Sequence, residues 1–146
     1  MRTVRDADGH TYLLVKRSAE SSRVRDPETG TETHLPNDEL EPAGGVDPLE
    51  AAARAVPDPV RRVLTVARSE RALGLLCELH ERGALPVRTV LAEYDLCESD
   101  AHGLFTEFRA AGLVTEADVH GERGYELTEA GRAGVGVLLD QAPGSA

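Results

Sequence analysis

Apolar residues between positions 84 and 132 follow first a helical and then a strand-like spacing. One set recurs at intervals of three and four residues, the pattern of a helix with one buried side, and comprises Ala101, Leu104, Phe105 and Phe108. A shorter helix is predicted to open at Pro86, with a turn at residues 94–97 before the longer helix. We expect Ser99 to cap the longer helix and Gly112 to end it, because glycine adopts left-handed backbone without strain.

Two short strand patterns follow, at residues 113–115 and 125–127, and the loop expected between them holds Gly121 and Gly124. Thr128 is expected to cap a last helix over residues 129–141. Three glycines inside that helix each cost about 1 kcal/mol relative to alanine, so a compensating contact is expected. A narrow face of small residues is suited to close approach by another helix, either of a second copy or of the same domain; it comprises Ala130, Ala133, Gly134, Val137 and Leu138.

The first 40 residues carry strand patterns instead. Segments 3–5, 10–17, 22–25 and 31–35 are rich in strand formers, and turn sequences at residues 6–9 and 26–30 predict an antiparallel meander of four strands. Residues 40–47 are expected to form a linker by their proline and glycine content. Capping residues then predict three helices. These helices cover residues 48–56, a segment from Pro59, and residues 70–82, with caps at Asp47, Asp58 and Ser69.

The segment AAGLVTEADVHGERGYELTEAGR resembles the helix end, wing and last helix of winged helix-turn-helix regulators of the MarR, PadR and ArsR kind. The resemblance covers roughly residues 69 to 140, and GLV and YELTEAGR are its most specific parts. It implies a DNA-binding transcription regulator, usually a homodimer. The meander resembles a module that precedes winged helices in haloarchaeal proteins.

The fold class expected is therefore α+β, with a winged helix-turn-helix domain preceded by a small antiparallel β-meander. The expected division is an N-terminal β-strand module at 1–42, a linker with accessory helices at 43–68, the winged domain at 69–141 and a flexible tail at 142–146. A chain of 146 residues is long enough to bury a core of this kind.

The charge of the chain bears on which partners it can bind. The formal net charge is −10, which opposes nonspecific binding to nucleic acid in dilute salt. The basic residues are fifteen arginines and one lysine, and this lysine depletion with surplus acid resembles proteins of halophilic archaea. Concentrated salt screens such charge, with a Debye length of roughly 3 Å at 1 M. Residues 1–25 alone are net positive, so a basic sheet face could contact phosphates or pair within the chain.

The predicted partner is double-stranded DNA, with the longer helix in the major groove and the wing along the backbone. Candidate contacts on that helix are Ser99, His102, Thr106 and Arg109, with Arg88 ahead of it and His120 and Arg123 in the wing. Glu98, Asp100 and Glu107 oppose this assignment, since carboxylates repel phosphates. Gly103 offers no side chain at a usual contact position.

No cofactor, metal or enzymatic activity is expected. Cys77 and His80 are three residues apart on one helix, but no further cysteine or histidine motif completes a tetrahedral site, and buried packing is the favoured reading of Cys77. The thiol of Cys97 could act as a sensor, or Cys97 could pair with Cys77 if the fold brings them together, although packing is again favoured. Glycine-rich phosphate loops and the HExxH and GxSxG motifs are missing from the sequence.

Two functions remain open. The first is a cytoplasmic homodimeric DNA-binding regulator, consistent with the lack of an apolar run of transmembrane length and of an apolar leader. The second is a non-enzymatic adaptor whose acidic winged helix docks on a protein. A positive strip formed by Arg88, His102, Arg109 and Arg123 would favour the regulator, and acids interrupting that strip would favour the adaptor.

Overall fold

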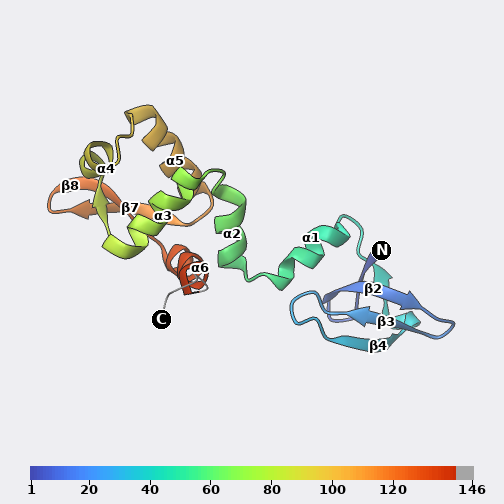
Figure 1. The fold of residues 1–146 in the computed structure, drawn as a ribbon. Helices are drawn as coiled ribbons and strands as arrows, with labels where there is room; N and C mark the ends of the chain where they lie inside the picture. The colour runs from blue at the N-terminus through green and yellow to red at the C-terminus, as the bar shows by residue number, and fades with distance from the viewer. Residues whose placement is uncertain (141–146) are drawn as a thin grey trace. The chain divides into compact units, whose positions relative to one another are not determined.

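The computed structural model describes residues 1–140, and the tail expected at residues 142–146 lies outside them. The fold is α+β, with two antiparallel sheets and six α-helices among the described residues, as Figure 1 shows. The chain divides into a unit of residues 1–57 and a unit of residues 58–146. The division falls inside the segment expected as a linker with accessory helices, and it assigns one helix of that segment to each unit.

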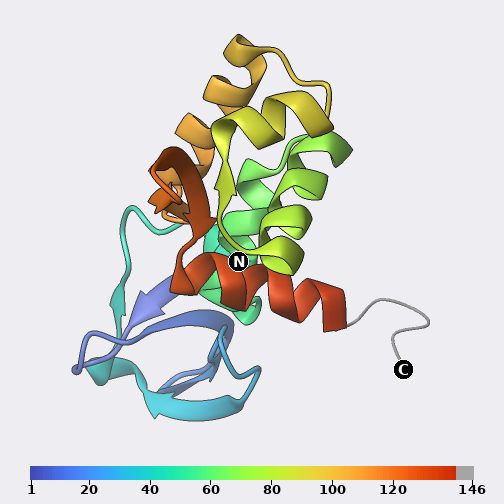
Figure 2. The ribbon, with the colours of Figure 1, turned by 90° about the vertical axis from the view of Figure 1, so that its left-hand side faces the viewer.

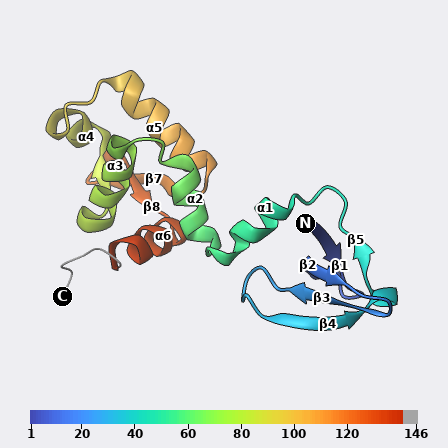
Figure 3. The ribbon, with the colours of Figure 1, turned by 45° about the vertical axis from the view of Figure 1, so that its right-hand side comes forward.

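Unit 1 is the predicted meander with one strand more. Its strands are β1 (Arg2–Arg5), β2 (Thr11–Arg17), β3 (Ser21–Arg25), β4 (Glu32–Pro36) and β5 (Glu41–Pro42), arranged in the order β4-β3-β2-β1-β5 (Figure 3). The sequence missed β5. Its two residues lie within the expected linker, and they form a strand because β1 offers an edge to pair with.

The α-helix of unit 1 begins where the sequence predicted. The Asp47 carboxylate accepts hydrogen bonds from the amides of Leu49 and Glu50 and so caps α1 (Pro48–Ala52). The predicted helix to residue 56 is shorter in the structure, because the chain tightens after Ala52 into the 3-10 turn η2 (Ala53–Ala55). A second 3-10 turn, η1 (Asn37–Glu39), joins β4 to β5.

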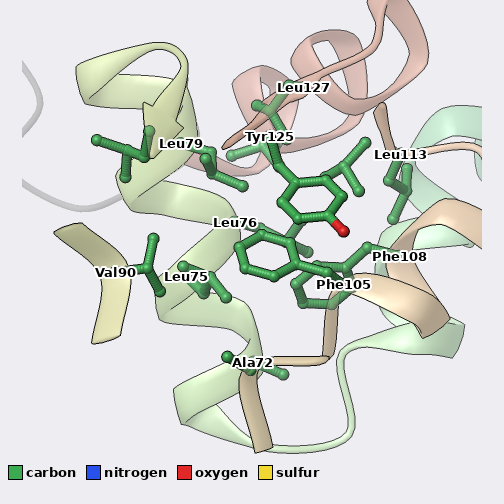
Figure 4. Close-up of a cluster of buried hydrophobic side chains, with 14 of the residues drawn as sticks. Ala72, Leu75, Leu76, Leu79, Val90, Phe105, Phe108, Leu113, Tyr125 and Leu127 are labelled. Atoms are coloured by element: carbon green, nitrogen blue, oxygen red, sulfur yellow. The ribbon is translucent and has the colours of Figure 1, made fainter. Parts of the chain in front are cut away.

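Unit 2 consists of five helices around a three-stranded sheet. Its helices are α2 (Asp58–Val66), α3 (Glu70–Arg82), α4 (Val87–Glu93), α5 (Glu98–Ala110) and α6 (Glu129–Asp140), and its strands are β6 (Leu85–Pro86), β7 (Val114–Val119) and β8 (Glu122–Leu127). The sheet has the order β6-β8-β7. A single cluster of fifteen buried residues includes side chains of α2, α3, α4, α5 and α6. Figure 4 shows part of this cluster, with Leu76, Phe105 and Phe108 close together. Burial of such side chains stabilises a fold by about 1.5–3 kcal/mol each.

Two glycines of α6 allow close approaches within unit 2. A Cβ on Gly131 would lie 2.2 Å from the Leu113 carbonyl oxygen, and one on Gly134 would lie 2.4 Å from that of Pro59. Helix α6 therefore packs on α2 within its own unit, where the two helices lie side by side (Figures 1 and 2). The prediction of which residues of α6 form the packed face was partly wrong. Val137 is exposed, whereas Gly131 and Val135, which were not predicted, are buried.

Candidate nucleic-acid interface

Helix α5 buries one side and exposes the other. Ala101, Phe105 and Phe108 are buried, and the Phe105 ring stacks on Tyr125 of β8 with centroids 4.1 Å apart. Gly112 ends the helix with φ of 72°, and the amide of Leu113 bonds back to the Phe108 carbonyl, as expected for a left-handed C′ residue. The exposed side carries the four predicted contact residues, Ser99, His102, Thr106 and Arg109.

The predicted cap of α5 is wrong. The N-cap is Cys97, and its side chain makes no capping hydrogen bond. Because Glu98 already has helical backbone, Ser99 lies inside the first turn, and its hydroxyl lies 3.4 Å from the Cys97 sulfur. The acids Glu98 and Asp100 occupy the same turn, where the helix dipole favours negative charge. Ser99 is consequently an exposed side chain in the first turn of α5, at its N-terminal end.

A two-residue turn at His120 and Gly121 joins β7 to β8. Both residues have positive φ, 54° and 83°, as tight hairpin turns of the primed types require. The Asp118 carboxylate accepts a hydrogen bond from the Gly121 amide at 2.8 Å and holds the turn. His120 therefore lies exposed at the hairpin tip.

The strands of the hairpin are longer than predicted, and Gly124 lies in β8 instead of the loop. Pro86 of β6 is its pairing partner, and a Cβ at position 124 would lie 2.3 Å from the Leu85 carbonyl oxygen. Glycine at this position thus lets β6 join the sheet. Beta-strand β6 was missed because two residues carry too little pattern to predict a strand.

One carboxylate, that of Glu116 on β7, links α5 to the hairpin. It lies 3.2 Å from the Arg109 guanidinium and 2.9 Å from that of Arg123. The pKa of Arg123 is raised by its hydrogen bond to the Tyr125 hydroxyl and by Glu116. Two predicted contact residues thus come together, with an acid between them.

The remaining predicted contact residues lie at the hairpin and at a pocket beside α5. The Arg88 side chain is 87% exposed and lies 3.7 Å from the Glu122 carboxylate of the hairpin. Ser99, His102 and Arg123 line a pocket of about 470 Å³ together with Glu98. The structure therefore gathers these three residues at one place, and Thr106 and Arg109 continue along the exposed side of α5.

Acids interrupt the positive strip of Arg88, His102, Arg109 and Arg123, the outcome expected to favour the adaptor. Glu116 contacts two of the arginines, and Glu122 is close to the third. Sequence reasoning singled out Glu98, Asp100 and Glu107 instead. The alternation of β7 could have flagged Glu116 as an exposed strand residue, but its partners on α5 and β8 depend on tertiary packing.

Arg71 is a further cation beside α5 that sequence reasoning missed. It lines one hollow with Ser99 and Asp100 and another with Tyr94. The residue is exposed, and within residues 1–140 it forms no ion pair. Its guanidinium is therefore available on the side of α5 away from Arg123.

The two cysteines differ in environment. Burial raises the pKa of the Cys77 thiol, whereas Cys97 is exposed. Both are free, so the alternative that they pair is wrong. Among the described residues no group of three or more potential ligands could hold a metal ion, and no helix is long and apolar enough to cross a membrane.

These features define an α+β protein with a separate β unit and a helical unit that presents α5 beside a hairpin. The chain belongs to DUF7346, a family of unknown function whose model matches residues 1–139. It is also similar to the crystal structure of the transcriptional regulator HlyU from Vibrio vulnificus CMCP6, with 28% identity, 55% of this chain and 83% of that chain covered, and a TM-score of 0.46. No curated protein matches the chain.

Proposed function

We propose that the chain is a DNA-binding transcription regulator of winged-helix type, with α5 as the reading helix and β7–β8 as the wing. The observation that carries the proposal is the exposed side of α5, where Ser99, His102, Thr106 and Arg109 follow one another without an acid between them in the stripe. Hydroxyl, imidazole and guanidinium groups at helical spacing match the donors and acceptors of base edges in the major groove.

Ion pairing to Glu116 is compatible with this function because the pairs are weak. Arg109, Arg123 and Glu116 have side chains about half exposed or more, and exposed pairs contribute about 0.2–1 kcal/mol each. Two guanidiniums share one carboxylate, so one positive charge remains. A phosphate that approaches the wing can replace Glu116 as the partner of either arginine.

The test of the reading helix is a footprint on genomic DNA fragments in molar KCl. A His102→Ala/Thr106→Ala variant should lose the footprint, because both side chains lie on the exposed side of α5. The control is His80→Ala/Thr65→Ala, which removes the same residue types from exposed positions on α3 and α2. A footprint retained by the α5 variant would overturn the assignment of α5.

Glu116→Gln separates this proposal from a second one. If Arg109 and Arg123 bind phosphates, the change should raise DNA affinity about twofold to thirtyfold, since it releases two pairs worth about 0.2–1 kcal/mol each. Affinity can be measured by fluorescence anisotropy with the footprinted duplex. A fall in affinity would contradict the wing assignment.

The second candidate is a non-enzymatic adaptor, favoured by the acids that interrupt the arginines. Glu116 and Glu122 are both about half exposed and available to a basic protein surface. On this reading no footprint forms, and a protein that copurifies in the wild type is lost in Glu116→Gln. The two candidates thus predict opposite consequences of one substitution.

We further propose that the regulator is a cytoplasmic homodimer from a halophilic archaeon, resembling MarR, PadR and ArsR regulators. Support for the dimer comes from Leu64 on α2 and Val137 on α6, which are 58% and 45% exposed on helices that contact each other. Sedimentation in molar KCl should give twice the chain mass. Leu64→Glu/Val137→Glu should give a monomer, and a dimer in that variant would move the interface elsewhere.

A further inference from the structure

Three basic side chains stand in register on adjacent strands of unit 1. Lys16 of β2 is directly opposite Arg23 of β3, and Arg23 is directly opposite His34 of β4. Directly opposite residues on antiparallel strands share one face of the sheet. All three are exposed. We refer to Lys16, Arg23 and His34 as the basic row.

An irregularity in β2 creates this row. Leu14 is opposite Val24, so a regular ladder would place Val15 opposite Arg23. The register shifts between Leu14 and Lys16, and the lysine takes that position. Like charges directly opposite destabilise a sheet, and a bulge interrupts its hydrogen bonds. The basic row therefore lowers the stability of the sheet, both by repulsion and by lost hydrogen bonds. Residues that lower stability in this way often serve a function.

Charges near the row leave it positive. Its one ion pair among the described residues joins Arg23 to Glu32 at 3.6 Å, with both side chains nearly half exposed. Four acids of unit 1 line a separate hollow of about 410 Å³, namely Asp6, Asp38, Glu39 and Glu41. On the same face as the row, Leu13 is buried beside Ala52 and Ala55 of the segment that follows β5.

We propose that the basic row binds the phosphate backbone of double-stranded DNA and reads no bases. Adjacent strands lie about 4.8 Å apart, so the row extends over about 10 Å. A duplex carries one negative charge per roughly 1.7 Å of its axis, which brings several phosphates within reach of the row. This contact is independent of α5, and it gives unit 1 a function that the winged-helix assignment does not supply.

The experiment measures binding of the full chain to a fluorescein-labelled 30-base-pair duplex of random sequence as a function of KCl concentration. Lys16→Gln/Arg23→Gln should weaken binding and make the slope of log affinity against log salt shallower by about 2, since each phosphate contact contributes about 0.9. The control is Arg5→Gln/Arg54→Gln, which removes the same charge from unit 1 outside the row and should leave the slope unchanged.

An unchanged slope in the row variant, an equal change in the control, or no binding of the duplex by the wild type would overturn the proposal. The melting temperature of the row variant should stay the same or rise, because opposed like charges are removed; a fall together with weaker binding would assign the effect to lost folding. His102→Ala/Thr106→Ala keeps the row. If that variant loses the footprint but keeps the salt slope, both proposals hold, and if it keeps both, the assignment of α5 alone fails.

Discussion

The buried side chains of unit 1 and unit 2 differ in kind. Unit 2 has a continuous cluster of fifteen buried residues, with Phe105 and Phe108 at its centre and glycines where α6 approaches its neighbours (Figure 4). Unit 1 has few buried apolar residues, and both buried polar residues of the described chain, Thr3 and Ser22, belong to it. Unit 2 is therefore stabilised by apolar packing, whereas unit 1 also depends on specific buried hydrogen bonds.

This difference matters for function because the exposed residues of the two units can be substituted under different constraints. The proposed reading side of α5 rests on the apolar cluster through Phe105 and Phe108, so its exposed residues can change without loss of the core. The basic row lies on a sheet whose buried groups are held by directional bonds. Substitutions in the two units should therefore differ in how much they lower the free energy of unfolding and in which residues lose protection.

The largest effect is expected from Phe108→Ala in unit 2. Phe108 is fully buried, and removal of such a side chain costs about 3–5 kcal/mol through lost transfer energy and the cavity left behind. Hydrogen exchange measured by mass spectrometry should show lost protection in residues 58–140 and unchanged protection in residues 1–57. Equal loss in both units would show that they unfold as one.

Two alanine substitutions in α6 test how closely this helix approaches α2. A Cβ at Gly134 would lie 2.4 Å from the Pro59 carbonyl oxygen, so Gly134→Ala should cost about 1–3 kcal/mol. At Gly136 the nearest atom is the end of the His80 side chain at 3.5 Å, and Gly136→Ala should add up to about 1 kcal/mol of stability. Urea unfolding measures both. The same sign for both changes would refute the close approach of α6 to α2.

Thr3→Val tests the polar contribution in unit 1. The Thr3 hydroxyl lies 2.7 Å from the Val46 carbonyl oxygen and 3.2 Å from that of Ala43, and valine keeps its shape without the donor. The change should cost about 1–3 kcal/mol, with lost protection in residues 1–57. The exposed Thr33→Val is the matched control and should change stability little. A stable Thr3 variant would remove the contrast between the units.

The smallest effect is expected from two serines near helix starts in unit 2. Ser69 accepts a hydrogen bond from the Ala72 amide at 3.1 Å, so Ser69→Ala should lower the free energy of unfolding by about 1 kcal/mol. Ser99 lies inside the first turn of α5, and Ser99→Ala should have almost no effect on stability. Thermal unfolding measures the stability of both variants. An equal loss of stability in Ser99→Ala would show that Ser99 caps α5.

Local patterns in the sequence were sufficient for much of the fold. The caps at Asp47, Ser69 and Thr128 and the helix end at Gly112 are confirmed, as is the four-strand meander. Each depends on residues within a few positions, which the sequence shows directly. The contact residues on α5 were predicted to be exposed for the same reason, and they are exposed.

Only the tertiary structure decided which charges meet. The spacing of residues 109, 116 and 123 does not reveal that one carboxylate contacts both arginines, because this contact requires α5 to pack on the hairpin. Likewise, alternation would place Val15 opposite Arg23, and only the shifted register brings Lys16 there. Side-chain periodicity is a local property, whereas register and helix packing minimise the energy of the whole unit. The sequence therefore determined all the α-helices and β-strands except the short strands β5 and β6, and packing decided the charge pattern of both proposed DNA contacts.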